Sequence, residues 1–298
     1  MKIGAIEAGG TKMVLAIYDE NDNMLDTTTY PTETPDITIP KIIDYFVKNK
    51  EKHKIDALGV GSFGPVDLNK NSKTYGFITS TPKIAWQNFP LLPTLLKALS
   101  VPTVIDTDVN AAVLAEVKMG VAKGCNSAVY VTIGTGIGAG VYVADSLVHG
   151  LLHPELGHIY MRPHKDDTLP KGVCPFHEGC LEGLAAGPAL GARIQGNAKT
   201  LPDDHPIFDI EAYYLAQMCV NLILTLSPEK IILGGGVMAR EKLFAKVRQE
   251  TQRLLNGYIK CNAIINDIDN YIVAPALFPV SGLVGSYLLG KKALASKI

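Results

Sequence analysis

The sequence of 298 residues has almost no net charge and no run of residues of one sign. It contains 28 Lys and Arg against 29 Asp and Glu, which gives a net charge of −1. A protein whose main partner is nucleic acid or an anionic membrane presents a basic surface, so we expect neither partner. The composition, 47% hydrophobic and 19% charged, is that of a globular protein long enough for two domains of about 150 residues each.

The sequence also has little that would direct it out of the cytoplasm. No stretch approaches the roughly eighteen apolar residues of a membrane span. Glu7 interrupts the first apolar stretch too early for a signal peptide. The five cysteines are an odd number, so a disulfide framework is not expected, and Cys219 is interpreted as a small buried apolar residue. We therefore expect a cytoplasmic protein.

Two glycine-rich turns, each between strand-like runs, are the most informative feature. The first is Gly9-Gly10-Thr11-Lys12 and the second is Gly134-Thr135-Gly136-Ile137-Gly138. Glycine permits close backbone approach and unusual dihedral angles, so such turns can present several N–H groups to a phosphate. Two of them in similar settings indicate a duplicated domain that holds a polyphosphate from two sides, as in a nucleotide-dependent phosphotransferase. The simpler alternative is two plain hairpins with mobile tips.

Two other phosphate-binding patterns do not fit these turns. A P-loop requires the spacing G-x-x-x-x-G-K-[ST] and a following helix, and Gly9–Lys12 has neither. A dinucleotide fingerprint must open a helix, but the second turn is followed by the strand-favouring run Val141-Tyr142-Val143.

The periodicity predicts an α/β protein, because strands precede helices in both halves. We expect a hinge near residues 110–125, between an N-terminal domain of residues 1–115 and a C-terminal domain of residues 116–284. A final helix, at about 285–298, is expected to return to the first domain. Residues 148–184 have little periodicity and are interpreted as an insertion in the second domain. Strands are expected within 1–30 and at 55–61, 103–106, 128–144, 231–233 and 271–274, and helices at 36–52, 91–99, 109–119, 189–195, 210–226, 240–255 and 282–295.

Two carboxylates stand at a strand end just before a helix, in Asp106-Thr107-Asp108. Phosphoryl transfer to an alcohol requires a carboxylate that accepts the proton of the attacking hydroxyl. An aspartate at this position is also a common helix cap. Spacing alone leaves both interpretations open.

A C-x-x-H-x-x-C pattern predicts a metal site in the insertion. Its residues are Cys174, His177 and Cys180, and His158 can supply a fourth ligand. Two sulfurs and two nitrogens suit tetrahedral Zn²⁺, and a closed set of four protein ligands indicates a structural ion. The alternative is two isolated cysteines and surface histidines. We interpret the nearby His149, His153 and His164 as loop histidines.

Glu155, His158 and Glu182 flank this cluster. Polar side chains on a loop held by a metal are well placed to hydrogen-bond several hydroxyls, and a sugar would meet that requirement.

With these motifs, nearly the whole chain resembles the ROK family of bacterial sugar kinases, in particular its fructokinase branch, within the actin-like ATPase superfamily. The resemblance implies duplicated ribonuclease-H-like domains with an interdomain cleft. It implies that Mg²⁺-bound ATP contacts both turns and two further segments, with ATP-binding residues Gly9, Gly10, Thr11, Lys12, Thr132, Gly134, Thr135, Gly136, Gly187, Pro188, Gly235, Gly236, Val237, Met238 and Ala239. Glu7 stands where many relatives have aspartate, and either carboxylate could orient Mg²⁺-bound water.

The same resemblance implies the chemistry. Asp108 would be the general base and a sugar contact, with Glu155, His158 and Glu182 as further sugar contacts. His158, Cys174, His177 and Cys180 would bind structural Zn²⁺. The implied reaction is phosphorylation of fructose to fructose 6-phosphate by a homodimer. Alternatives are a kinase for mannose, glucose or N-acetylmannosamine, and a sugar sensor without catalysis. A repressor of this family would carry a helix-turn-helix before the first turn, which here begins at residue 7.

Overall fold

The computed structural model describes residues 1–295, except for the side chains of Lys50 and Glu51. The chain divides into two compact units. Unit 1 contains Met1–Met119, Leu147–Pro154 and the C-terminal residues from Leu277 on, and unit 2 contains Gly120–Ser146 and Glu155–Ala276. Each unit is built on one five-stranded mixed sheet, so the predicted α/β class is confirmed.

The sheet of unit 1 has the order β3-β2-β1-β4-β5. The first three strands in the sequence pair antiparallel, whereas β4 and β5 join parallel to β1. All three strands expected within residues 1–30 are present. The strands are β1 (Lys2–Ala8), β2 (Lys12–Asp19), β3 (Met24–Pro31), β4 (Ala57–Ser62) and β5 (Thr103–Thr107).

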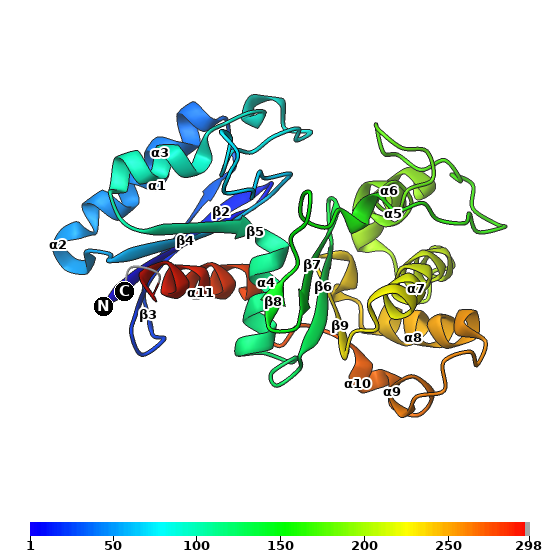
Figure 1. The fold of residues 1–298 in the computed structure, drawn as a ribbon. Helices are drawn as coiled ribbons and strands as arrows, with labels where there is room; N and C mark the ends of the chain where they lie inside the picture. Colours follow the sequence, from blue (N-terminus) through cyan, green and yellow to red (C-terminus); the bar gives the residue numbers. More distant parts are fainter. Residues whose placement is uncertain (296–298) are drawn as a thin grey trace. The chain divides into compact units, whose positions relative to one another are not determined.

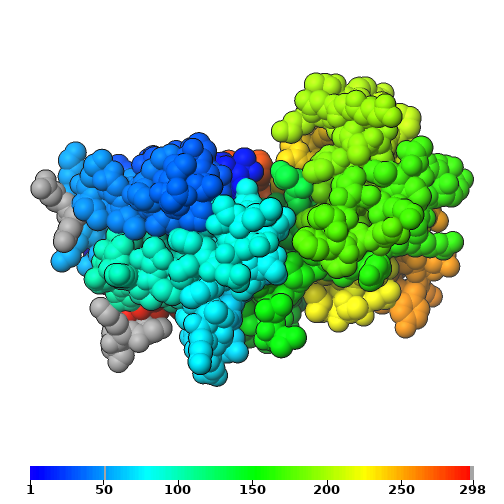
Figure 2. Space-filling model, turned by 90° about the horizontal axis from the view of Figure 1, so that it is seen from above, coloured from blue at the N-terminus to red at the C-terminus, as the bar shows by residue number. Residues whose placement is uncertain are grey.

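Helices cover both faces of this sheet (Figure 1). On one face lie α1 (Pro35–Lys48) and α3 (Leu91–Leu99), whose outer surfaces are the blue and blue-green areas of Figure 2. The helix expected at 36–52 ends at Lys48, and α2 (Lys50–His53) follows it. On the other face α4 (Asp108–Lys118) packs against α11 (Ser281–Ala295).

The irregular stretch 69–88 contributes Ile78 and Trp86 to the core of unit 1. Trp86, at the end of the 3-10 turn η1 (Ile84–Trp86), is 1% exposed, and its indole N–H donates to the carbonyl of Glu33 at 2.8 Å. Its ring packs edge-on against Phe63 and Phe89. Sequence periodicity does not find such a residue, because no helix or long strand surrounds it.

The sheet of unit 2 repeats the hairpin arrangement, with the order β10-β9-β6-β7-β8. Its strands are β6 (Ser127–Ile133), β7 (Ile137–Val143), β8 (Ser146–Leu147), β9 (Lys230–Gly234) and β10 (Ile272–Val273). Its longer helices are α6 (Gly187–Ile194), α7 (Ile207–Leu226) and α8 (Glu241–Leu255), and its shorter ones are α5 (Leu181–Ala185), α9 (Asn262–Ile265) and α10 (Ile268–Tyr271). Three 3-10 turns complete it: η2 (Leu156–His158), η3 (Ala198–Thr200) and η4 (Val237–Ala239).

The expectation that no segment approaches a membrane span needs correction at α7. Its 20 residues have a mean hydropathy of 1.3 in the most apolar window, which is long and apolar enough for a span by those two criteria alone. In the structure 61% of that window is buried inside the protein, as in the core helix of a globular domain. Ordinary packing against α8 therefore accounts for its composition.

One part of the expected insertion groups with unit 1. We expect residues 148–184 to belong to the second domain, but Leu147–Pro154 lies in unit 1. The physical reason is two histidine contacts to that unit. His149 Nε2 lies 2.9 Å from Asp106 Oδ2, and the backbone N–H of Val66 donates to His153 Nε2 at 3.1 Å.

Candidate functional site

The first glycine turn closes the β1–β2 hairpin. The N–H of Gly9 donates to the carbonyl of Lys12 at 3.0 Å. A Cβ on Gly9 would lie 2.8 Å from that oxygen, so a side chain here would force the turn apart. Gly9 and Gly10 are half-buried, whereas Thr11 and Lys12 are exposed at the tip. The turn therefore leaves backbone and a lysine side chain accessible to a ligand.

Glu7 lies on β1 just before this turn. Burial raises the pKa of Glu7 to about 6, although the charge of Lys12 and a hydrogen bond from the backbone of Leu283 act in the opposite direction. The first turn of α11 comes so close that a Cβ on Gly282 would lie 2.5 Å from Glu7 Oε1. The carboxyl group is thus held in a confined position next to the turn.

The junction of β5 and α4 decides which residue caps the helix. Thr107 is the cap, because its hydroxyl accepts a hydrogen bond from the N–H of Asn110 at 3.1 Å. Asp108 is the first residue of α4 and is half-buried, and its Oδ1 accepts from the N–H of Val109 at 2.9 Å. Of the two interpretations that spacing left open, the capping role belongs to neither aspartate.

Asp106 is the centre of a buried polar cluster. The residue is 5% exposed, and its Oδ1 accepts hydrogen bonds from the N–H of Thr107 at 2.8 Å and from Asn110 Nδ2 at 2.7 Å. His149 Nε2 lies 2.9 Å from its other oxygen. His149 and His153 do lie in a loop, as the sequence interpretation has it, but that interpretation missed their side-chain contacts to unit 1. Only tertiary proximity reveals this, because His149 is 43 residues from Asp106.

In unit 2 the structure brings three predicted ATP-binding segments together. The N–H of Gly134 donates to Gly136 within the second turn, and the N–H of Gly187, at the start of α6, donates to the carbonyl of Gly134 at 2.8 Å. Gly235 has φ +87°, and a Cβ there would lie 2.4 Å from the carbonyl oxygen of Ile133. All three segments therefore meet at one end of the sheet.

The predicted ATP-binding residues of these segments differ in their exposure to solvent. Thr135, Pro188, Gly236 and Ala239 are exposed, and Thr132 and Val237 are half-buried. Met238 is only 5% exposed, so its side chain belongs to the core of unit 2.

Glu182 connects the second turn to the loop that carries the cysteines. Its Oε2 accepts a hydrogen bond from the N–H of Ile137 at 2.8 Å. Glu155 is an exposed residue, but desolvation of its carboxyl group raises the pKa of Glu155 to about 7. The negative charge of Glu182 raises this pKa further, as the smaller of the two causes. Two of the predicted sugar contacts therefore lie within electrostatic range of each other.

The predicted metal ligands form one cluster. The ligand atoms of His158, Cys174, His177 and Cys180 all lie within 4.8 Å of one another. His158 Nδ1 lies 3.9 Å from Cys174 Sγ and 3.8 Å from Cys180 Sγ, and His177 Nδ1 lies 3.8 Å from Cys174 Sγ. Tetrahedral Zn²⁺ with ordinary bond lengths separates sulfur and nitrogen ligands by about 3.6 Å. These residues fit a zinc ion after small side-chain movements.

Backbone hydrogen bonds shape the loop around this cluster. The N–H of Met161 donates to Gly179 at 2.9 Å, and the N–H of Leu181 donates to Ile159 at 2.9 Å. Cys180 caps α5 by accepting from the N–H of Gly183. The ligands are thus arranged by the local fold as well as by any ion.

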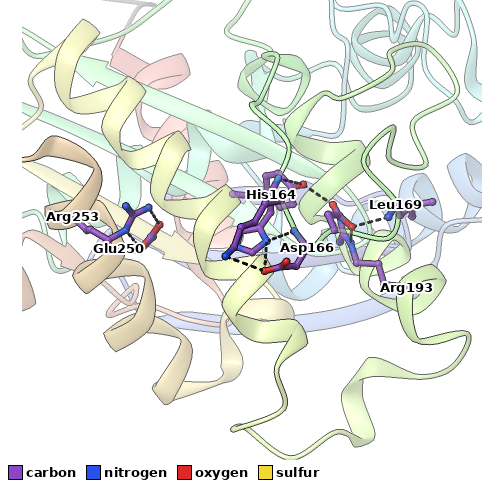
Figure 3. Close-up of polar contacts among 9 residues, drawn as sticks. His164, Asp166, Leu169, Arg193, Glu250 and Arg253 are labelled. Atoms are coloured by element: carbon purple, nitrogen blue, oxygen red, sulfur yellow. Dashed lines mark hydrogen bonds and ion pairs between the residues drawn. The ribbon is translucent and has the colours of Figure 1, made fainter.

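A second, buried polar cluster fastens the same loop to α6 and α7 (Figure 3). Arg193 donates two hydrogen bonds to Asp167, at 2.8 and 2.9 Å, and the hydroxyl of Tyr214 donates to the same carboxylate at 2.6 Å. The side chains of Arg193 and Asp167 are 1% and 0% exposed. Burial opposes ionisation of Asp167, but these hydrogen bonds outweigh it and lower its pKa.

The sequence matches the ROK family over residues 3–293, and the chain belongs to this family. It is 45% identical to the fructokinase of Lactococcus lactis subsp. cremoris over 92% of this chain and 91% of that protein. It is 43% identical to the fructokinase of Pediococcus pentosaceus over 99% of both chains. Among solved structures it resembles the ROK hexokinase of Thermus thermophilus, with a TM-score of 0.77 and 25% identity over 99% of this chain and 100% of that one. The predicted family and its actin-like ATPase fold are thus confirmed.

Proposed function

We propose that this protein is a fructokinase, which transfers the γ-phosphoryl group of ATP to the primary hydroxyl of D-fructose. The observation that carries the proposal is the nearly full-length similarity to two fructokinases at 43% and 45% identity. The products would be fructose 6-phosphate and ADP. Residues of the sites described above would perform the reaction.

The two glycine turns would hold the phosphates of ATP. Backbone N–H groups at Gly9 and Gly10, and at Gly134 and Gly136, suit an anion because glycine lets the phosphate approach the chain closely. Thr11, Lys12, Thr132 and Thr135 would add side-chain contacts at the phosphates. The segments that meet the second turn would bind the nucleoside side, through Gly187, Pro188, Gly235, Gly236, Val237, Met238 and Ala239. The support is the convergence of three of these segments at Gly134, Gly187 and Gly235.

Asp108 would be the general base. As the fructose oxygen forms its bond to the γ-phosphorus, its proton passes to the Asp108 carboxylate and the bond to the ADP oxygen breaks. A half-buried aspartate at the first position of a helix suits this role, because the capping hydrogen bond is already made by Thr107. Mg²⁺ accompanying ATP would neutralise phosphate charge, and Glu7 would orient its bound water.

The sugar hydroxyls would be held by Asp108, Glu155, His158 and Glu182. A structural Zn²⁺ bound by His158, Cys174, His177 and Cys180 would keep this loop in one shape. The donor set and its spacing support zinc, since thiolate and imidazole ligands in a closed group of four suit that ion. His158 would then serve both the ion and the sugar, one ring nitrogen for each.

The family resemblance further supports a cytoplasmic homodimer with domains near the expected limits, residues 1–115 and 116–284, except that Leu147–Pro154 and the chain from Leu277 on group with the first domain. Light scattering after size exclusion would measure the subunit number directly. A monomer mass would contradict the dimer and leave the proposed activity unaffected.

The decisive experiment is a coupled assay for ADP with fructose, mannose, glucose and N-acetylmannosamine tested one at a time. We expect fructose to give the highest kcat/KM. Asp108→Asn should lower kcat at least about 100-fold while the fold is retained by circular dichroism. Asp209→Asn is the matched control, because Asp209 is also in the first turn of a helix but is exposed and contacts only Lys246 among the polar partners in the described residues.

Preference for another hexose would keep a sugar kinase and replace fructose as substrate. Full activity in Asp108→Asn would remove Asp108 from the role of base. No turnover of any hexose by folded, zinc-loaded protein would favour a sugar sensor.

A further inference from the structure

His149 occupies a position that none of the roles above uses. It lies in the segment Leu147–Pro154, yet its Nε2 is 2.9 Å from Asp106 Oδ2 and 3.4 Å from Asn110 Nδ2. Asp106 lies two residues before Asp108 in the sequence, and Asn110 lies two residues after it. The imidazole therefore contacts the chain on both sides of the proposed base.

The chemistry of the 2.9 Å contact fixes where a proton must be. An ionised carboxylate only accepts hydrogen bonds, so His149 Nε2 must carry the hydrogen that it shares with Asp106. The hydrogen bond to Asp106 raises the pKa of His149, which favours the imidazolium. The 3.4 Å approach of the Asn110 amide is then a packing contact, since both nitrogens are donors.

The partners of His149 depend on it in different ways. Asp106 is 5% exposed, and loss of His149 would remove the ring nitrogen that contacts its Oδ2 at 2.9 Å. Asn110 is fully buried, and its Oδ1 has no hydrogen-bond partner among the described residues. Its amide is therefore oriented mainly by Nδ2, which donates to Asp106. Movement of Asp106 would be passed on to the first turn of α4.

We propose that His149 is a positioning residue for phosphoryl transfer, acting through Asp106 and Asn110 on the helical turn that carries Asp108. The inference rests on the proposed role of Asp108 as the base. Residues that orient a reacting group through hydrogen bonds typically contribute one to two orders of magnitude, because small misplacements slow the chemical step.

The charges around His149 come from three elements. Asp106 on β5 favours its imidazolium form, and Lys292 on α11 opposes it. The neighbouring His153 is buried at 7% exposure, and desolvation lowers the pKa of His153, which favours its neutral form. The two histidine pKa values near Asp106 are therefore shifted in opposite directions. Deprotonation of His149 as pH rises would remove the positive charge that is hydrogen-bonded to Asp106.

The test uses the full-length enzyme with ATP and its best hexose, and measures kcat and both KM values between about pH 6 and 9. We expect His149→Ala to lower kcat about 10- to 100-fold with little change in KM for ATP. His149→Gln retains an N–H near the position of Nε2 but no charge. It should lose less activity, and it should also lose the decline in kcat that wild type shows as His149 deprotonates.

His205→Ala is the matched control. His205 is half-buried, and its Nδ1 accepts a hydrogen bond from the N–H of Ile207 at 3.2 Å at the start of α7, far in the sequence from the Asp108 helix. Its kcat and pH profile should match wild type. Wild-type turnover with an unchanged kcat and pH profile in folded His149→Gln and His149→Ala would overturn the positioning role alone. Absence of turnover by wild type would overturn the proposed function and this role together.

Discussion

Glu182 Oε2 accepts a hydrogen bond from the backbone N–H of Ile137 at 2.8 Å. The contact joins Glu182, two residues after the last cysteine of the proposed zinc site, to the glycine turn proposed to hold phosphate. A Cβ on the preceding Gly136 would lie 2.7 Å from the same carboxylate oxygen, so the turn approaches Glu182 as closely as glycine permits. A hydrogen bond therefore links a residue proposed to bind the sugar directly to the turn proposed to bind ATP, within unit 2.

This connection predicts a coupled kinetic defect. Glu182→Ala should raise KM for both fructose and ATP, because it removes a sugar contact and also frees the N–H of Ile137. Glu182→Gln retains a carbonyl acceptor and should restore KM for ATP more fully than KM for the sugar. Glu178→Ala is the control, since Glu178 lies on the same loop but is exposed and pairs with Lys171. An ATP KM unchanged in Glu182→Ala would contradict the coupling.

Removal of one thiol should remove the metal. We expect purified protein to contain one zinc per chain by elemental analysis, and Cys174→Ser to contain far less, because a structural site needs all four ligands. Thermal unfolding of Cys174→Ser, and of wild type after chelation, should begin at a lower temperature. Cys261→Ser should keep its zinc, since Cys261 is exposed and outside the cluster. Stoichiometric zinc in Cys174→Ser would exclude the proposed ligand set.

Glu7 should make stability depend on pH. Burial raises its pKa to about 6 in the folded protein, above the usual value of 4.5. The folded state therefore binds the proton more tightly, and its relative stability falls as pH rises from about 4.5 through about 6. Above this pH window, the free energy of unfolding is lower by about 2 kcal/mol, which is the energy that corresponds to the difference between the two pKa values.

Glu7→Gln removes this dependence because the amide does not ionise. Urea unfolding without ligand should show Glu7→Gln more stable than wild type at neutral pH, with a smaller difference at acidic pH. The same variant should lose activity, since it can no longer orient Mg²⁺-bound water with a negative charge. Asp204→Asn, a change at an exposed residue, should show neither effect. Equal stability of Glu7→Gln and wild type at both pH values would refute the ionisation argument.

Arg193 forms a buried ion pair and Arg253 forms an ion pair on the helix surface, and both arginines are labelled in Figure 3. Arg193→Met should lower the free energy of unfolding by about 3–5 kcal/mol, because it leaves Asp167 as a buried charge without its cation. Arg253→Met should leave the unfolding midpoint nearly unchanged, because Arg253 is 62% exposed and its pair with Glu250 is on the helix surface. Similar urea midpoints for the two variants would show that Asp167 finds another partner.

A second buried carboxyl group, that of Glu211, also interacts with the charge of Arg193. Its residue is fully buried, and its carboxylate oxygens have no hydrogen-bond partner among the described residues. Burial raises the pKa of Glu211 well above its usual value, while the charge of Arg193 acts in the opposite direction. Loss of Arg193 would therefore favour the protonated form of Glu211, and it would also raise the pKa of Asp167, because the hydrogen bond and the charge of Arg193 both help to lower that pKa.

The sequence by itself determined the repeated hairpins, the order of most elements and the four residues of the metal cluster. These features are local: glycine marks turns, alternation and helical periodicity mark strands and helices, and C-x-x-H-x-x-C places three ligands within one loop. The helix Leu91–Leu99 and the strand–helix junction at Thr107 and Asp108 follow from the same local signals.

Only the tertiary structure decided the contacts of His149, His153, Arg193 and Trp86. Each of these side chains contacts a residue at least 26 positions away, so no short pattern contains both partners. A histidine in an irregular segment has the same sequence signature whether it is solvated or bound to a buried carboxylate. Burial and partner are set by how distant segments pack, and they raise the pKa of His149 through its hydrogen bond to Asp106 and lower the pKa of His153 through desolvation.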